Sequence, residues 1–179
     1  MENGGKNAQS AHLRLNKKTN AVPPPMRLPA LDPETVTEVR RSGYPEPFFS
    51  RMGDRAKRKL GDACGLTKFG VNLVTLGPGG QSALRHWHTL EDEFVYVLAG
   101  EVVLITDEGE QVLTAGMCAG YPAGAKNAHH FVNRSGAPAR YLEIGDRTPG
   151  DHAFYPDDDL LWVEDENGVH SAHKDGSRY

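Results

Sequence analysis

From Lys68 onward, apolar and polar residues alternate in short runs. The alternation is clearest in Glu93–Leu98 and Val102–Thr106, and Ala99–Glu101 between them has the composition of a hairpin turn. Phe69–Leu76 is a third run, closed by three glycines and a proline. A period of two is typical of strands, because successive side chains point to opposite faces of a sheet. These runs therefore predict β-strands joined by tight turns.

Several other short runs extend this pattern along the chain. We expect further strands at Leu84–His88, Gln111–Leu113, Cys118–Tyr121, His129–Asn133, Arg140–Ile144 and Leu160–Val163. Strands of this length, spaced about 8–12 residues apart, are typical of a sandwich or a barrel. The sequence has no internal repeat that would indicate a second copy of the same unit. The fold class is therefore predicted to be all-β, with a single domain.

The first 43 residues are expected to be an N-terminal arm. Residues 1–22 are polar and basic, with no sustained apolar period. Asp32-Pro33-Glu34 then offers an N-cap, a proline at the first helical position and an acidic first turn. We therefore expect a short helix at Thr35–Ser42.

Residues 44–163 are assigned to the barrel and residues 164–179 to a polar C-terminal tail. Phe48–Arg51 is expected to be the first edge strand of the barrel. The charged run Asp54–Lys59 has two interpretations. It is either a solvated loop or edge strand whose charges prevent aggregation, or a rim that binds phosphate.

Composition narrows the class of protein. The net charge of −4 gives no sign of a nucleic-acid or anionic-membrane partner. No apolar run approaches the roughly 18 residues of a membrane span, and the N-terminal residues lack the apolar centre of a secretory signal. Two cysteines, Cys64 and Cys118, are too few for a disulfide framework. A cytoplasmic protein is expected.

The chemistry centres on the motif GQSALRHWHTLEDEFVYVLAG. Gly80 is followed after five residues by His86, and then by His88, Glu93 and Gly100. Histidines two apart on a strand point the same way, and a turn can return Glu93 to their side. Two neutral imidazoles and a carboxylate are ligands for a divalent transition metal.

A second motif follows in GMCAGYPAGAKNAHHFVN. It runs from Gly116 through Pro122 and Gly124 to His129 and, three residues further, Asn133. The two motifs together resemble those of the cupin superfamily, in its small single-domain members. The family pattern has two residues between the last glycine and the histidine, whereas this chain has four. The resemblance implies a jelly-roll-like β-barrel with His129 as a fourth metal ligand beside His86, His88 and Glu93.

Three nitrogens and one oxygen suit one Mn, Fe, Co, Ni, Cu or Zn ion per chain, and not Ca or Mg. His130 competes with His129 for the fourth position, but the spacing to Asn133 selects His129. Cys118 and Tyr121 are candidate catalytic groups, although a cysteine on a strand is more often an apolar filler. Candidate substrate-binding residues are Gln81, Arg85, Lys126 and His130.

The resemblance leaves the activity open, because cupins include enzymes, storage proteins and sensors. The stretch from GLTKFGVNL to EIGDRTPGD is similar to a group of compact bacterial cupins that includes methylthio-xylulose-phosphate methylsulfurylases. We therefore expect a metalloenzyme for a small, sugar- or keto-derived and phosphorylated substrate, working by isomerisation, elimination or thiol transfer. The alternatives are a noncatalytic small-ligand sensor and a metal-dependent dioxygenase. Outward-facing Phe94, Tyr96 and Leu98 favour a homodimer.

Overall fold

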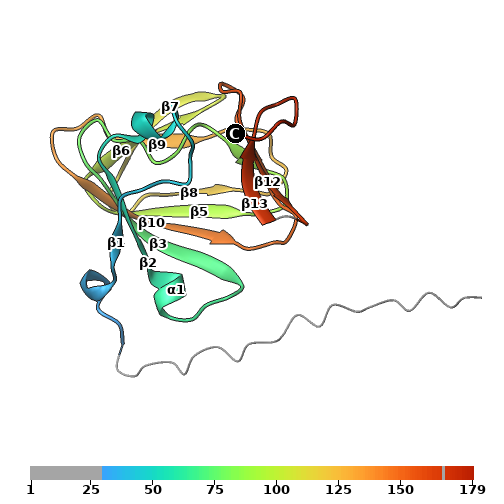
Figure 1. Cartoon of the computed structure of the whole chain (residues 1–179). Coiled ribbons are helices and arrows are strands. Elements are labelled where there is room, and N and C mark those ends of the chain that lie inside the picture. The colour runs from blue at the N-terminus through green and yellow to red at the C-terminus, as the bar shows by residue number, and fades with distance from the viewer. Residues whose placement is uncertain (1–29, 167) are drawn as a thin grey trace, which may run out of the picture.

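Thirteen short strands account for most of the regular structure in residues 30–166 and 168–179, the part of the chain that the computed structural model describes. The strands form three antiparallel sheets (Figure 1). The largest contains, in order, β1 (Glu38–Val39), β2 (Arg55–Lys59), β3 (Phe69–Leu76), β10 (Ala139–Asp146), β5 (Glu93–Ala99) and β8 (Cys118–Tyr121).

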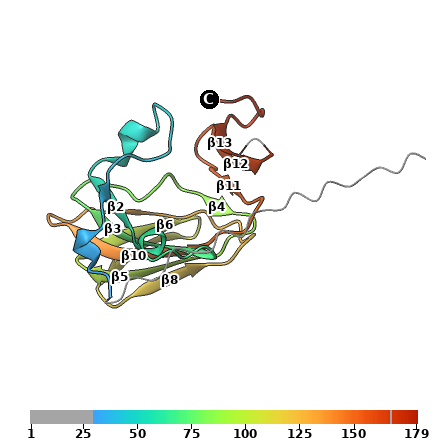
Figure 2. The ribbon, with the colours of Figure 1, turned by 60° about the horizontal axis from the view of Figure 1, so that its bottom comes forward.

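The two smaller sheets complete the barrel. One contains β7 (Gly109–Thr114), β6 (Glu101–Thr106) and β9 (His130–Val132). The other contains β13 (Gly168–Ala172), β12 (Leu161–Asp165), β11 (His152–Phe154) and β4 (Trp87–His88), and stands to one side of the larger sheet (Figure 2). This architecture confirms the predicted jelly-roll-like, all-β fold. No helix among the described residues is long and apolar enough to cross a membrane.

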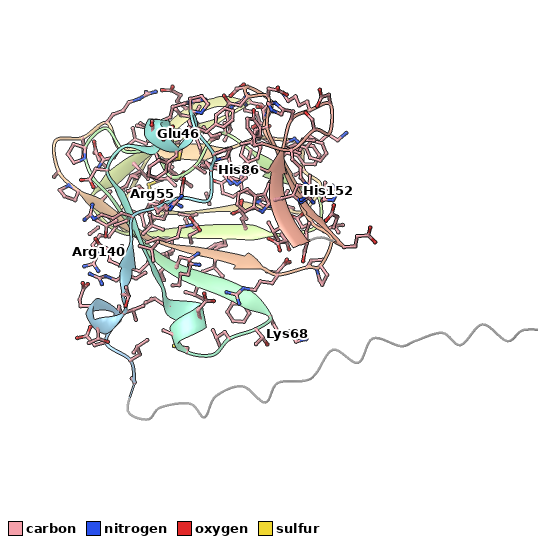
Figure 3. The ribbon with its side chains drawn as sticks, in the orientation of Figure 1. Glu46, Arg55, Lys68, His86, Arg140 and His152 are labelled. Carbon is pink, nitrogen blue, oxygen red and sulfur yellow. The ribbon has the colours of Figure 1, made fainter. Side chains whose placement is uncertain are left out.

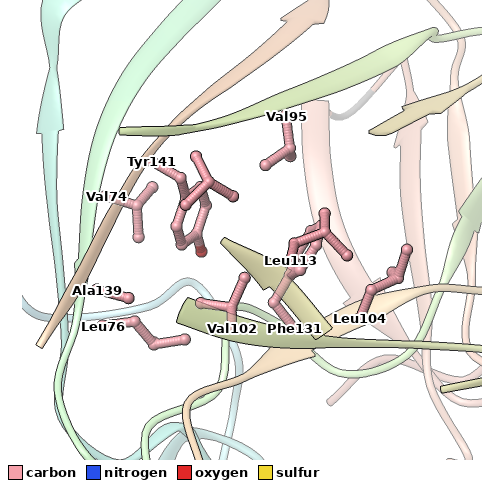
Figure 4. Close-up of a cluster of buried hydrophobic side chains, with 10 residues drawn as sticks. Val74, Leu76, Val95, Val102, Leu104, Leu113, Phe131, Ala139 and Tyr141 are labelled. Atoms are coloured by element: carbon pink, nitrogen blue, oxygen red, sulfur yellow. The ribbon is translucent and has the colours of Figure 1, made fainter. Parts of the chain in front are cut away.

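Alternation along the strands decides which side chains enter the core. On β5, Val95 and Val97 are buried, whereas Phe94, Tyr96 and Leu98 are exposed on the other face. The main core lies between the six-stranded and the three-stranded sheets (Figure 4). Its members are Val74, Leu76, Val95, Val97, Val102, Leu104, Leu113, Phe131, Ala139 and Tyr141.

A second, smaller core closes one end of the barrel. It contains Phe48, Met52, Leu84, Ala153, Tyr155 and Leu160, with Tyr44 and Trp162 packed against it. The chain before β2 and the chain after β10 both contribute to this core. Segments that lie far apart in the sequence therefore pack together at this end of the barrel.

Two secondary-structure predictions at the start of the barrel were wrong. The helix expected at Thr35–Ser42 is a single 3₁₀ turn, η1 (Pro33–Thr35), followed by β1, although the Asp32 side chain accepts the predicted capping bond from the Glu34 N–H at 3.0 Å. Phe48–Arg51 is not a strand, because η2 (Phe49–Met52) is a 3₁₀ helix that buries Met52. Of the arm predicted for residues 1–43, residues 1–29 lie outside the described residues, whereas Glu38–Val39 pair with β2 in the large sheet.

The C-terminal region contains structure that the sequence did not reveal. The expected boundary at residue 163 falls within β12, and β13 pairs along its whole length with β12. The short strand β11 was also missed, and it pairs with both β12 and β4. A short helix, α1 (Leu60–Ala63), connects β2 to β3.

Candidate metal centre

Two short backbone pairings position the histidines. His88 lies on β4, which pairs with β11, and His86 forms an isolated bridge with His129 in which the two residues exchange both backbone hydrogen bonds, at 3.1 and 2.8 Å. Trp87 points the other way and stacks on Phe154, with ring centroids 4.8 Å apart. The alternation predicted from the motif is therefore confirmed.

Glu93 lies at the centre of this group. Its Oε2 atom is 3.6 Å from His86 Nε2, 3.8 Å from His88 Nε2 and 3.0 Å from His129 Nε2. One ligand atom from each of His86, His88 and Glu93 lies within 4.8 Å of the other two. His129 adjoins this cluster through its contact with Glu93.

The Nδ1 atoms of His86 and His88 both have hydrogen-bond partners. His86 Nδ1 lies 2.8 Å from the Leu84 carbonyl oxygen, and His88 Nδ1 lies 2.5 Å from Asp151 Oδ2. Both partners are acceptors, so each Nδ1 carries the proton and each neutral ring presents an unprotonated Nε2. Such contacts also fix the orientation of a ligating imidazole.

The arrangement fits a bound cation. Glu93 Oε2 is buried and has no hydrogen-bond partner among the described residues. It faces the lone pairs of His86 and His88, and acceptors that face one another in a buried site need a cation between them. Two imidazoles and a carboxylate, with His129 beside them, are the donor set of a divalent transition metal.

The protonation states also suit ligation. Burial lowers the pKa of His86 to about 4, even though Glu93 acts to raise it. Burial alone would raise the pKa of Glu93, but the neighbouring imidazoles of His129, His86 and His88 hold that pKa well below its usual range. At neutral pH the site therefore has a neutral His86 and an ionised Glu93, the forms that bind a metal.

Asp151 contacts the ligand cluster, and the sequence analysis missed it. It is buried beside His88 and accepts further hydrogen bonds from the Thr89 hydroxyl at 3.0 Å and the Leu90 N–H at 2.7 Å. It therefore holds both the imidazole and the turn that leads from β4 to β5. No motif spacing marks it, because it follows His88 by sixty-three residues and lies beyond both motifs.

The metal cluster opens into a cavity of about 440 Å³. His86 and Arg55, labelled in the upper part of Figure 3, both line it. Its wall also includes Val39, Arg41, Ser42, Gly43, Tyr44, Lys57, Lys59, Ser82, Ala83, His88, Glu93, Glu143, Ala153, Tyr155 and Trp162. This volume lies within the range of small-molecule sites.

The inner face of the large sheet places a second carboxylate near Glu93. Glu143 on β10 pairs with Val95, two residues from Glu93, and Gly145 is the residue opposite Glu93. Lys57 Nζ lies 2.5 Å from Glu143 Oε1, and the Asn72 amide donates to the same oxygen at 3.1 Å. Lys57 holds the pKa of Glu143 below its usual range against the effect of burial, which would raise it.

The charged run Asp54–Lys59 belongs to this wall. Its residues 55–59 form β2, which lies between β1 and β3 and is not the edge of the sheet. Side chains two apart share a face, so Arg55, Lys57 and Lys59 all line the cavity. That alternation is the sequence signal that could have identified them.

Of the two candidate catalytic residues, Cys118 lies away from the ligand cluster and Tyr121 lies beside it. Cys118 is exposed and pairs with outward-facing Tyr96, so its thiol lies on the outer face of the sheet and its predicted catalytic role is corrected. Tyr121 pairs with Glu93 and stacks on His129, with ring centroids 3.4 Å apart. Its buried hydroxyl has no partner among the described residues, and it does not line the large cavity. Tyr121 therefore packs against the imidazole of His129, and its catalytic role stays a prediction.

None of the four candidate substrate-binding residues lines this cavity. Arg85 forms ion pairs with Asp107 and Asp157 on the outside of the barrel. Lys126 lies over the outward-facing Trp87 ring, 5.8 Å from its centroid, and Gln81 donates to the Ala83 carbonyl at 3.3 Å. These assignments are corrected: Arg85 adjoins His86 in the chain and points away from it, while Gln81 and Lys126 lie outside the named strands.

His130 also turns away from the cluster. Its Nδ1 lies 3.1 Å from the Ala83 carbonyl oxygen, while His129, Phe131 and Asn133 are buried on the inner face. The expected choice of His129 over His130 is consistent with this arrangement.

Comparisons with known proteins agree with this geometry. A family model described as a Cupin domain matches residues 72–145. A crystal structure of a cupin-superfamily sugar phosphate isomerase from Silicibacter pomeroyi DSS-3 is 46% identical, covers 84% of this chain and 96% of its own, and superposes with a TM-score of 0.80.

Two further solved structures are more distant. A protein of Acidithiobacillus ferrooxidans, described as a candidate sugar phosphate isomerase, is 30% identical over 70% of this chain and 80% of its own, with a TM-score of 0.63. A polyketide cyclase from Streptomyces resistomycificus is 23% identical over 67% of this chain and 80% of its own, with a TM-score of 0.54, and shows a shared fold alone. No curated protein matches the chain.

Proposed function

Since the chain belongs to the cupin superfamily, we propose that it is a metal-dependent enzyme that isomerises a small sugar-derived or keto substrate. His86, His88, Glu93 and His129 hold one divalent transition metal per chain. The observation that carries the proposal is that the ligand cluster opens into a cavity whose wall also holds a separate carboxylate, Glu143. The names of the 46% and 30% identical relatives support the same class of reaction.

A divalent ion in this position supplies Lewis-acid polarisation of a substrate carbonyl or hydroxyl. Isomerisation of a hydroxy-carbonyl compound moves one proton between neighbouring carbons and a second from the hydroxyl oxygen to the neighbouring carbonyl oxygen; the first needs a group that accepts it and returns it. Glu93 and the histidines face the ion, so this task falls to Glu143. Its carboxylate, held ionised by Lys57, takes the proton from the carbon beside the carbonyl and delivers it to the adjacent carbon.

The aromatic side of the cavity limits access of water. Tyr155 stacks on His86, with ring centroids 5.6 Å apart, and Tyr44 packs edge-on against both Tyr155 and Trp162. The Tyr44 hydroxyl donates to the Tyr155 hydroxyl at 3.3 Å. A substrate bound against this wall exchanges its hydration for protein groups, which strengthens electrostatic interactions at the reacting atoms.

Two measurements test the proposal. Protein purified without chelator is analysed for transition metals, and is then incubated with aldose and ketose phosphates in D₂O while proton NMR follows exchange at the carbons beside the carbonyl. We expect one metal per chain and exchange that depends on it. Metal with ligand binding but no exchange would indicate the noncatalytic binding protein, and no metal would refute the site.

We further infer a homodimer. The outer face of β5 exposes Phe94, Tyr96 and Leu98, which are each 39–44% accessible. A row of large apolar side chains on one sheet face is a surface that a second copy can cover with twofold symmetry.

A further inference from the structure

Most arginines in the described part of the chain have a carboxylate partner. Ion pairs are formed by Arg40, Arg51, Arg58, Arg85, Arg134, Arg140 and Arg147. The exceptions among residues 30–166 and 168–179 are Arg41, Arg55 and Arg178. Arg178 lies near the C-terminus, whereas Arg41 and Arg55 both line the large cavity.

Lys59 is a third cation without a carboxylate partner in the described structure, and it lines the same cavity. It lies on the same face of β2 as Arg55, because the two are four residues apart on one strand. Arg41 reaches the cavity from the segment after β1, which pairs with β2. Two cations from β2 and one from the segment after β1, all without an ion-pair partner in the described structure, therefore line the same cavity.

Arg55 is the most enclosed of the three. Its Nε atom is buried and has no hydrogen-bond partner among the described residues. An unpaired buried guanidinium N–H is costly unless a ligand satisfies it. Glu143 in the cavity wall is influenced by the charge of Arg55 but forms its ion pair with Lys57. Arg55 therefore has no ion pair of its own among the described residues.

The charge of the cavity indicates what it binds. Four cationic side chains and two carboxylates line it, and the carboxylate Glu93 faces the metal ligands. The side chains alone carry an excess of positive charge, before any metal is counted, and this favours an anionic group such as a phosphate monoester, which carries about −1.5 to −2 charges near neutral pH. Arginine also presents a fork of donors that fits phosphate oxygens.

We propose that Arg41, Arg55 and Lys59 form a phosphate-monoester subsite in the cavity into which the metal ligands open. The inference rests on the proposed function, because it identifies the substrate as a sugar phosphate whose phosphoryl group is held by β2. Lys57 is not part of the subsite, since its ammonium is occupied by Glu143.

Binding of small probes to the full chain tests the subsite without a turnover assay. Glycerol 3-phosphate, glycerate and glycerol are titrated calorimetrically into the wild type, Arg55→Gln, Lys59→Gln and the control Lys68→Gln. Lys68 is an exposed cation outside the cavity wall. Each protein is measured both with and without bound metal, so that phosphate held directly by the ion is recognised.

We expect glycerol 3-phosphate to bind more tightly than glycerate, and glycerol not to bind measurably. Each cavity variant should weaken glycerol 3-phosphate binding about tenfold or more, while Lys68→Gln binds like the wild type. Lys59 is exposed, so Lys59→Gln tests the site even if Arg55→Gln lowers the melting temperature.

Three results would overturn the subsite. These are wild-type affinity for glycerol 3-phosphate in both cavity variants, glycerate binding as tightly as glycerol 3-phosphate, and phosphate binding that requires the metal and is unchanged by both substitutions. Loss of metal or of proton exchange alone would instead refute the proposed function, because the subsite should bind phosphate in the metal-free chain.

Discussion

His88 Nδ1 lies 2.5 Å from Asp151 Oδ2, although sixty-three positions of sequence separate the two residues. The contact fixes the tautomer of the ring and points Nε2 at Glu93. The same carboxylate accepts from the backbone at Leu90, so it also holds the turn before β5. Ligand and turn are thus positioned by one buried side chain.

Replacing Asp151 should therefore weaken metal binding without removing a ligand. In Asp151→Asn the amide can donate to Nδ1, which moves the ring proton to Nε2 and blocks ligation. We expect affinity to fall about 10–100-fold, as measured by competition with a chromogenic chelator. Asp159→Asn is the matched control, because Asp159 lies 2.8 Å from His173 Nδ1 outside the site. Equal losses in the two variants would contradict the assignment.

Adjacent histidines provide a second test. His129→Ala should lose bound metal on dialysis, because His129 Nε2 lies 3.0 Å from Glu93 Oε2 in the cluster. His130→Ala should keep the wild-type metal content, since that ring turns toward the Ala83 carbonyl. Metal analysis of both variants checks this. Retention of metal by His129→Ala would reduce the site to His86, His88 and Glu93.

Glu143→Gln should separate proton transfer from metal binding. The amide cannot accept a proton from carbon, so we expect kcat to fall about 10²–10⁴-fold with unchanged metal content. Glu101→Gln, an exposed change at the start of β6, should leave both unaffected. Solvent exchange measured by NMR is the readout. Wild-type exchange in Glu143→Gln would assign the proton to another group.

The outer face of β5 is expected to form the dimer interface. Light scattering at micromolar concentration should give twice the 19.6 kDa mass of one chain. Leu98→Lys should give the monomer mass, because a charge buried in an apolar interface is costly. Val112→Lys changes an equally exposed apolar residue on β7 and should remain dimeric. A monomeric wild type would refute the interface.

The sequence alone determined the features that depend on local periodicity. Alternation placed His86 and His88 on one face, and it predicted that Phe94, Tyr96 and Leu98 point outward. The turn glycines are equally local: Gly100, at φ 73°, adopts a conformation that other residues rarely take. Such patterns follow from backbone geometry and need no distant partner.

Only the tertiary structure decided which distant residues share the site. Lys57 meets Glu143 because β3 lies between β2 and β10 in a particular register, and Cys118 faces outward because it pairs with Tyr96. A shift of one residue in either pairing would exchange the two faces of the strand. Register between strands far apart in sequence is set by the burial of the whole core, which no short motif records.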